Sequence, residues 1–337
     1  MGCPFTVRRT RREALRLGLA VGGAAFLGSA LELAGAIGAP EKSARGDRAS
    51  RVVIAREEGL RATQAEPERL LPLLDRGIEA LFGGPAREVW SHLLKPDYVV
   101  GIKVNGLAGR GMSTRRSLVE ALVRRIETAG VPRRRVLVWD RLCADLKRAG
   151  YPLNQGGEEV QCYGNDVGGY DQKLTTHRSI GSLLAQALTR ECSVVINVPV
   201  LKDHGICGVT LAMKNFFGAI HNPNKYDLGT GDPYIADLNS LPAVRNKTVL
   251  TVADAISAQC EGGPPFMPNW AWDYGGLLFA TDPVAMDAVG WRILEAERKG
   301  RGLSSLREAN REPTYIATAA RLGIGTDDPG RIEVVTV

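Results

Sequence analysis

The sequence contains no closely spaced cysteine pair. None of its six cysteines stands in the C-x-x-C spacing that is typical of zinc or iron–sulfur ligands. We therefore expect no local iron–sulfur or zinc motif, and any cofactor remains unknown. Five cysteines follow residue 36, so at least one thiol should stay unpaired even in an oxidising compartment. The six are Cys3, Cys143, Cys162, Cys192, Cys207 and Cys260.

A strong excess of positive charge is also lacking. The formal net charge of the 337 residues is +6, and half of it comes from five arginines against two glutamates in residues 1–36. The excess that remains is too small for a basic groove that follows a phosphate backbone. The sequence thus predicts no nucleic-acid partner.

A hydrophobic run of membrane-spanning length is absent as well. The segment Leu17–Leu31 has only 15 residues, whereas a membrane-spanning helix needs about 20. It follows a basic stretch and precedes the small residues Ala34-Gly35-Ala36, which is the order of a secretory signal and its cleavage site. Within the basic stretch, Thr10-Arg11-Arg12 followed by Leu15 resembles the twin-arginine signal.

These features predict a twin-arginine signal peptide over residues 1–36, with the twin-arginine export machinery as a partner. The mature protein should be soluble, without a stable membrane span after cleavage, and exported to the periplasm or the extracellular space. An ordinary secretory signal and an uncleaved anchor are the alternatives.

Strand and helix patterns alternate beyond a polar linker at residues 37–50. This alternation favours one α/β domain over residues 51–337, with a mainly parallel, doubly wound (Rossmann-like) sheet, helices on both faces and loop insertions at 222–246 and 257–275. The predicted strands cover 51–55, 98–104, 135–140, 159–164, 193–201, 247–256, 276–282 and 331–337. The predicted helices cover 68–82, 113–130, 141–150, 179–192, 208–220 and 283–300.

Polar side chains stand where several predicted strands end. Ligands of such sheets bind outside the carboxyl ends of the strands. We therefore expect five strands to deliver charged or amide side chains to one ligand-binding edge. The predicted ligand-binding residues are Lys103, Asn105, Asp140, Asn197, Thr210, Asn215, Asp254 and Asp282.

Some of these residues also have a structural explanation. Asp282-Pro283 is a standard helix start, with the aspartate as cap, and Asp140 can cap the helix that follows it in the same way. Lys103 interrupts an otherwise buried strand, where a lysine needs an anionic partner from the protein or from a ligand.

The densest polar stretch is LKDHGICGVTLAMKN, residues 201–215. Gly205 and Gly208 mark a turn ahead of the helix predicted at 208–220, and a helix start with outward backbone N–H groups attracts carboxylate or phosphate. The P-loop pattern is absent. We predict that Lys202 and Lys214 hold an anion and that His204, whose ordinary pKa lies near neutrality, is the acid/base. Cys207 is the one thiol in a polar setting, but it has no partner cysteine nearby in the sequence.

The same stretch resembles the signature of the domain-of-unknown-function 362 family, an Asn-x-Pro-x-x-Lys-x-His run followed by Thr, Lys-Asn and Gly. The resemblance covers about residues 98–295, including GIKVN at 101–105 and ATDPVAMDAVG at 280–290. It implies an α/β protein of a family that is often exported and that in some members carries an iron–sulfur module, whose cysteine motifs this sequence lacks. The residues matching the signature are Asn197, Pro199, Lys202, His204, Thr210, Lys214, Asn215 and Gly218.

We therefore expect an exported enzyme of unassigned reaction that binds a carboxylate or phosphate substrate or cofactor, with redox chemistry left open. Its catalytic residues would be His204, Lys202 and Lys214. One alternative is a non-catalytic protein that binds a metal, a cofactor or an envelope anion. A metal site would combine His204 with Asp140, Asp254 or Asp282, and the polar strand ends can instead form an internal salt-bridge network.

Overall fold

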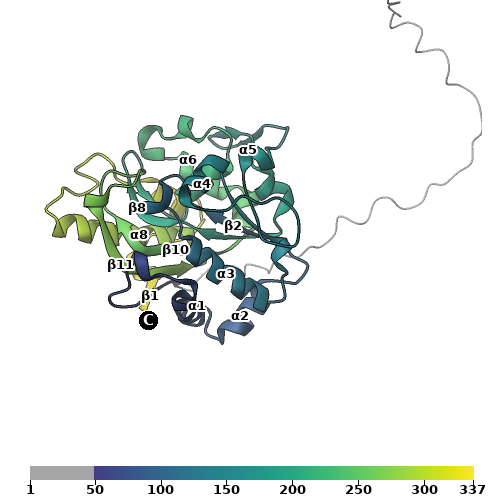
Figure 1. Ribbon diagram of the computed structural model, residues 1–337. Helices are drawn as coiled ribbons and strands as arrows, with labels where there is room; N and C mark the ends of the chain where they lie inside the picture. Colours follow the sequence, from purple (N-terminus) through teal and green to yellow (C-terminus); the bar gives the residue numbers. More distant parts are fainter. Residues whose placement is uncertain (1–48) are drawn as a thin grey trace, which may run out of the picture. The chain divides into compact units, whose positions relative to one another are not determined.

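The computed structural model describes residues 49–337, which are drawn in colour in Figure 1. The predicted signal peptide and nearly all of the predicted linker lie outside the described residues. Within the part of the chain that is described, no helix is both long and apolar enough to cross a membrane.

One sheet of ten strands forms the centre of the domain. Its strands are β1 (Ser50–Arg56), β2 (Val100–Val104), β3 (Val136–Asp140), β4 (Gln161–Gly164), β7 (Val194–Val198), β8 (Val200–His204), β9 (Gly208–Thr210), β10 (Thr248–Gln259), β11 (Ala271–Ala280) and β12 (Ile332–Thr336). The main order is β12-β1-β11-β10-β7-β2-β3-β4, and β8 pairs with β10 and β9. The six pairs β12·β1, β10·β7, β10·β8, β7·β2, β2·β3 and β3·β4 are parallel, so the predicted mainly parallel sheet is confirmed.

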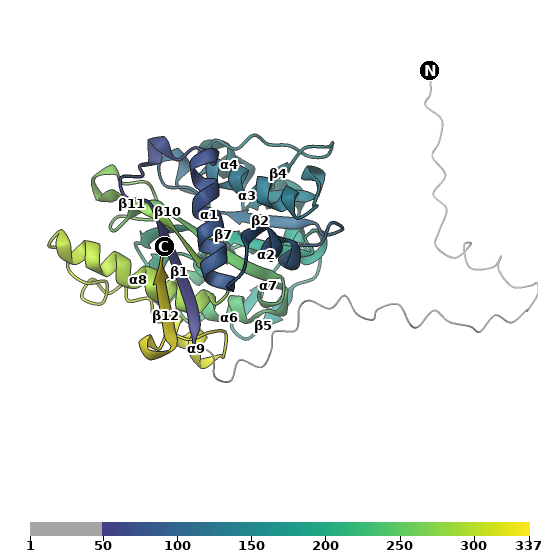
Figure 2. The same cartoon turned by 90° about the horizontal axis from the view of Figure 1, so that it is seen from below.

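Helices cover both faces of this sheet, as expected (Figures 1 and 2). Successive side chains of a strand point to opposite faces, and along β7 Val194 and Ile196 join one hydrophobic cluster whereas Val195 joins the other. The first cluster includes side chains of α1 to α3 and the second includes side chains of α6, α8 and α9. The helices are α1 (Pro67–Phe82), α2 (Ala86–Leu93), α3 (Arg116–Thr128), α4 (Cys143–Ala149), α5 (Asn165–Gly168), α6 (Tyr234–Ser240), α7 (Pro242–Arg245), α8 (Pro283–Gly300) and α9 (Tyr315–Arg321).

The helix predicted over 208–220 is wrong, and with it the helix start that was expected to bind an anion. The chain instead turns back after β8, and β9 pairs antiparallel with it, so that Lys202 lies opposite Thr210. Gly208 has a φ of +76°, which suits glycine and allows this reversal. Only a 3₁₀ turn follows, over Lys214–Ala219. The helix predicted over 179–192 is present only in its second half, as a π helix over Ala187–Glu191. The first half instead forms strand β6 (Ile180–Ser182), which pairs with β5 (Thr175–His177).

The direction of β11 corrects the expectation that Asp282 joins the ligand-binding edge. β11 runs antiparallel to β10, so its carboxyl end lies at the opposite edge of the sheet. Asp282 caps α8 there, accepting the backbone N–H groups of Val284 at 2.9 Å and Ala285 at 3.0 Å. The helix-start explanation of Asp282 is the correct one.

Candidate functional site

A cavity of about 420 Å³ opens at the carboxyl ends of β2, β3 and β8. This volume lies within the range of pockets for small molecules. The structure thus brings most of the predicted residues together around one space, although Lys103, Asn197, Asp254 and Asp282 do not line it. The predicted residues that line it are Asn105, Asp140, Lys202, His204, Thr210, Lys214 and Asn215.

Lys202 on β8 is a buried lysine that has no carboxylate partner among residues 49–337. Its side chain is 0% exposed, and Nζ donates to Asn105 Oδ1 at 3.0 Å and to the backbone oxygens of Met112 and Pro264, each at 3.2 Å. Burial lowers its pKa from 10.5 to about 8, although Asp140 and Asp203 act in the opposite direction from beyond hydrogen-bonding distance. The ammonium therefore carries a charge that no directly bonded group compensates, and it can lose its proton near neutral pH.

A chain of amide side chains fixes the orientation of Asn105, whose Oδ1 accepts a hydrogen bond from Lys202. Asn105 Nδ2 donates to Asn215 Oδ1 at 3.3 Å, and Asn215 Nδ2 donates to Asn197 Oδ1 at 2.8 Å. Asn197 in turn donates to the backbone oxygen of Ala212 at 2.9 Å. Because each amide has one donor end and one acceptor end, the series leaves Asn105 Oδ1 pointing at Lys202. Asn197 is therefore a positioning residue in the core rather than a wall of the cavity.

Lys103 and Asp140 form a buried ion pair beside the cavity. Lys103 Nζ lies 2.7 Å from Asp140 Oδ1, and the second carboxylate oxygen accepts the backbone N–H of Gly106 at 2.7 Å. Burial lowers the pKa of Lys103. The anionic partner that the sequence required for Lys103 thus comes from the protein. Asp140 does not cap α4, whose first backbone N–H, at Cys143, donates to Asp166 Oδ1 at 2.8 Å instead.

Gly218 leaves the room that this ion pair occupies. A Cβ at this position would lie 2.6 Å from Asp140 Oδ1 and 2.8 Å from Lys103 Nζ. Disturbing a buried pair costs about 3–5 kcal/mol, so Gly218→Ala should lower the free energy of unfolding by about 3 kcal/mol in urea denaturation. Gly181→Ala is the matched control, since nothing lies within 4 Å of a Cβ there. Equal stability of the two variants would contradict this role of Gly218.

His204 is held as a neutral hydrogen-bond donor. Its Nδ1 accepts the backbone N–H groups of Ile206 at 3.2 Å and Cys207 at 3.1 Å, so the proton of the neutral ring sits on Nε2. Burial, and then the charge of Lys214, lower its pKa from 6.5 to about 3. The ring stays neutral through the physiological range, and it lines the cavity as a donor rather than as the acid/base that the sequence suggested.

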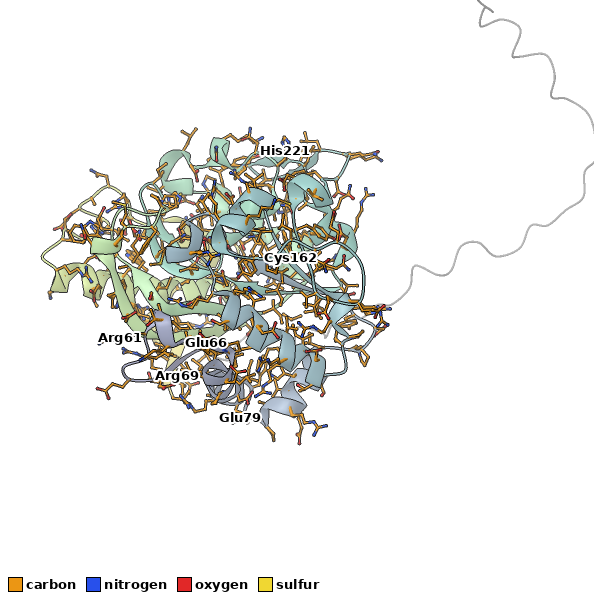
Figure 3. All side chains as sticks on the ribbon, in the orientation of Figure 1. Arg61, Glu66, Arg69, Glu79, Cys162 and His221 are labelled. Atoms are coloured by element: carbon orange, nitrogen blue, oxygen red, sulfur yellow. The ribbon has the colours of Figure 1, made fainter. Side chains whose placement is uncertain are left out.

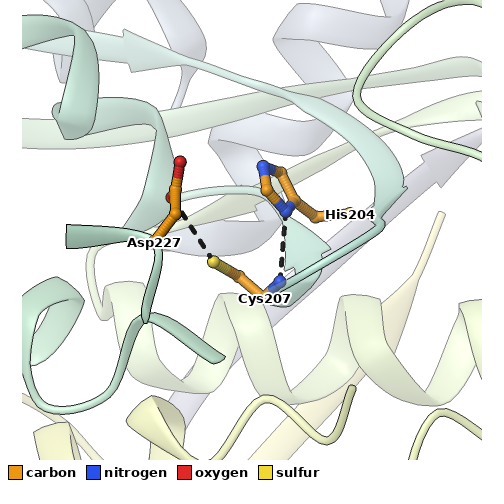
Figure 4. A group of neighbouring side chains, drawn as sticks. All are labelled: His204, Cys207 and Asp227. Atoms are coloured by element: carbon orange, nitrogen blue, oxygen red, sulfur yellow. Dashed lines mark hydrogen bonds between the residues drawn. The ribbon is translucent and has the colours of Figure 1, made fainter. Parts of the chain in front are cut away.

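Lys214 points into a small polar group that contains Asp227, Cys207 and His204. Lys214 Nζ lies 2.5 Å from Asp227 Oδ1 and 3.7 Å from the centre of the Phe217 ring. Cys207 Sγ lies 3.7 Å from Asp227 Oδ1. Figure 4 shows Cys207 together with His204 and Asp227. Burial raises the pKa of the Cys207 thiol to about 12. The thiol is therefore protonated and unreactive at neutral pH.

His204, Cys207 and Asp227 also offer one metal-ligand atom each within 4.8 Å of one another. Two features oppose a cation here. The backbone N–H groups at Nδ1 keep the proton on Nε2, where a metal would need a lone pair, and the ammonium of Lys214 already neutralises Asp227. Among the described residues, no group of potential ligands combines His204 with Asp140, Asp254 or Asp282, so the metal site suggested by the sequence does not form.

Cobalt titration tests this interpretation. A thiolate bound to Co²⁺ gives a strong absorption band, because light transfers an electron from the sulfur to the metal. We expect no such absorption when Co²⁺ is added to the wild-type protein, because the thiol is protonated and the carboxylate is paired. A band that appears in the wild type and is lost in Cys207→Ala would overturn the assignment.

Asp203 positions the loop that carries Pro264. Asp203 Oδ1 accepts the backbone N–H of Gly263 at 2.9 Å, and Oδ2 lies 3.2 Å from Arg311. Arg311 also contacts Glu261 at 2.6 Å. Since the Pro264 oxygen accepts a bond from Lys202, these ion pairs hold one side of the Lys202 environment in place. Asp203 was not predicted as a site residue. It directly follows Lys202 on β8, and adjacent residues of a strand point to opposite faces.

Asp254 lies inside β10, five residues before the end of that strand, and not at its carboxyl end. Its Oδ1 lies 2.6 Å from the guanidinium of Arg115, and its Oδ2 accepts the Arg115 backbone N–H at 2.9 Å. Asp254 thus fixes the start of α3, and it has no place among the residues that line the cavity.

Three charged residues of the cavity, Arg141, Asp145 and Asp227, were not singled out from the sequence. Arg141 directly follows Asp140, lines the cavity and makes no hydrogen bond or ion pair within the described chain. Asp227 lies in the insertion 222–246, where length alone indicated a function. That insertion is more ordered than expected, since it contains α6 and α7.

The cysteines do not form disulfides in the described part of the chain. All five are free, and four are buried. Figure 3 shows the described side chains, with Cys162 among those labelled. Burial raises the pKa of Cys162 to about 12 and that of Cys192 to about 12. These thiols are core residues, and none of them adds a reactive group to the cavity.

Comparison with known families gives one match. Residues 93–292 match the family described as a domain of unknown function, DUF362. No curated protein matches the chain.

Proposed function

The chain belongs to the DUF362 family, whose description names no activity, and from its cavity we propose that it is an enzyme acting on a small molecule that carries a carboxylate or phosphate. The anion would bind over Lys202, at the carboxyl edge of the sheet. The reaction is left unassigned.

The observation that carries this proposal is the unequal pairing of charges around the cavity. Its three carboxylates are each held by a cation of the protein, whereas Lys202 and Arg141 have no carboxylate partner in the described part of the chain. A buried charge without a partner is costly, and an anionic ligand removes that cost. The paired carboxylates are Asp140 with Lys103, Asp145 with Arg148 and Asp227 with Lys214.

The roles of the cavity residues follow from their protonation states. Lys202, whose pKa is lowered to about 8, is the group that can give or accept a proton near neutral pH. His204 would donate from Nε2 to an oxygen of the ligand, as a neutral imidazole. Arg141, which also lines the cavity, would contact the same anion directly. Lys214, paired with Asp227, would shape the wall and add little net charge.

Export through the twin-arginine pathway is part of the proposal. It is supported by Thr10-Arg11-Arg12 and by the short apolar segment that follows. Expression of the full chain in a host with and without a working twin-arginine translocase tests it. Periplasmic protein that persists without that translocase would refute this route.

Direct binding tests the anion site. Succinate, 2-oxoglutarate, phosphate and pyrophosphate are each titrated into the purified protein by calorimetry, with the neutral diamide of succinate as the matched control. We expect at least one anion to bind with a micromolar to millimolar dissociation constant and the diamide not to bind. Absence of binding by every anion would refute the proposal.

A second experiment separates the enzyme from a non-catalytic binding protein with the same pocket. The bound anion is incubated with the protein in deuterated water and followed by proton NMR. Exchange of ligand protons for deuterium, or conversion of the ligand to a product, supports an enzyme if it is lost when Lys202 is replaced. An anion that binds and stays unchanged, with or without added oxidants and reductants, supports a binding protein instead.

A further inference from the structure

The mouth of the cavity is lined by exposed aliphatic side chains. Leu107 is 44% exposed and Ile206 is 48% exposed, and both line the cavity. They come from different loops, one after β2 and one between β8 and β9. Single exposed leucines are common on protein surfaces, whereas two that converge on one pocket mark a place where apolar surface is to be covered.

Further apolar residues line the cavity. Phe217, Pro223 and Pro264 line the cavity together with the glycines at 205 and 218, which present no polar side chain. Lys202, which is fully buried, donates to Asn105. The cavity therefore combines a buried charge at Lys202 with the exposed apolar side chains of Leu107 and Ile206.

We propose that the ligand is amphipathic, with a carboxylate or phosphate head over Lys202 and an alkyl or aryl group that passes between Leu107 and Ile206. The anionic head rests on the proposed function, and the apolar group is the new element. A small, fully polar anion would leave both exposed side chains in water. An apolar substituent would cover them and gain roughly fourfold in affinity for each methylene group that it buries.

A series of ligands with one head and increasing chain length tests this inference. Acetate, butanoate, hexanoate and octanoate, and alkyl phosphates of the same lengths, are titrated into the mature protein by calorimetry. We expect affinity to rise roughly fourfold per added methylene until the chain extends beyond the mouth. The series that binds more tightly identifies the head group.

Variants of Leu107 and Ile206 test whether these two side chains cause the gain in affinity with chain length. Leu107→Ser combined with Ile206→Ser should leave acetate or methyl phosphate binding unchanged and should reduce the gain for the longer chains by about tenfold. Both side chains are exposed, so the fold should be retained, and circular dichroism checks this. Leu174→Ser is the matched control, because Leu174 is 62% exposed and does not line the cavity.

The outcomes separate this inference from the proposed function. Anions that bind equally well at every chain length would overturn the amphipathic ligand and leave the anion site standing. A chain-length gain that survives in the double variant would overturn the role of these two side chains. If no member of either series binds while one of the small anions of the first experiment does, this inference is wrong and the anion site stands; if none of these anions binds, both are wrong.

Discussion

Lys202→Met should lose anion binding by about 100-fold or more. A hydrogen-bonded contact to a buried charge contributes about 1.5–3 kcal/mol, and 2.7 kcal/mol corresponds to 100-fold. Methionine keeps an unbranched side chain, one atom shorter than that of lysine, and removes the charge. The measurement is calorimetric titration of whichever anion binds the wild type most tightly. Lys202→Gln provides a second variant, since an amide still donates to the oxygens that Lys202 bonds with.

Lys247→Met is the matched control for this change. Lys247 Nζ also donates to three backbone oxygens, those of Leu188, Thr189 and Cys192, and burial lowers its pKa as well. It does not line the cavity. We expect Lys247→Met to lower stability and to leave anion affinity within about twofold of the wild type. Equal loss of binding in both variants would mean that Lys202 acts only through the fold.

Anion affinity should fall as the pH rises above about 8. Lys202 loses its proton there, because burial lowers its pKa to about 8, and the neutral amine no longer attracts an anion. The fall approaches tenfold per pH unit for an anion that binds only the ammonium form. Titrations at pH 7, 8, 9 and 10 measure it. The Lys202→Met variant should show no such slope.

The stability of the protein should also depend on the protonation of Lys202, but it should rise with pH where anion affinity falls. The pKa of Lys202 is about 8 in the folded chain and 10.5 for an ordinary lysine. Between these values the unfolded state binds the proton and the folded state does not, so the free energy of unfolding rises with pH. The wild type should therefore gain up to about 3 kcal/mol over Lys202→Met between pH 8 and pH 10.5. Urea denaturation of both proteins at the two pH values checks this, and a difference that stays constant would show an unshifted pKa.

The strands and long helices could be predicted because their patterns are local. The helix predicted at 283–300 matches α8, whose cap at Asp282 and Pro283 are visible in the sequence. Segment 208–220 failed because its apolar residues suit a helix and a strand equally. The pairing of β9 with β8 decided between them, and that contact depends on the turn at Gly208.

Site residues were predicted from the rule that ligands bind outside the carboxyl ends of parallel strands. The rule held only for strands that run in the assumed direction. It placed Asn105, Asp140 and Lys202 around one cavity, because β2, β3 and β8 belong to the parallel part of the sheet. It failed for Asp282, because antiparallel pairing of β11 follows from contacts between distant segments. It also could not foresee that Asp254 pairs with Arg115 and does not line the cavity.

The sequence by itself determined the α/β class, the family and which polar residues stand at strand ends, because periodicity, caps and a family signature are properties of neighbouring residues. The tertiary structure alone decided which charges are paired. Lys103 and Lys202 look alike in the sequence, yet one bonds to Asp140 and the other to three neutral oxygens. Their difference arises from groups 37 to 97 residues away, brought within 3.2 Å by the sheet. The charge left without a partner, and hence the candidate anion site, is a product of that packing.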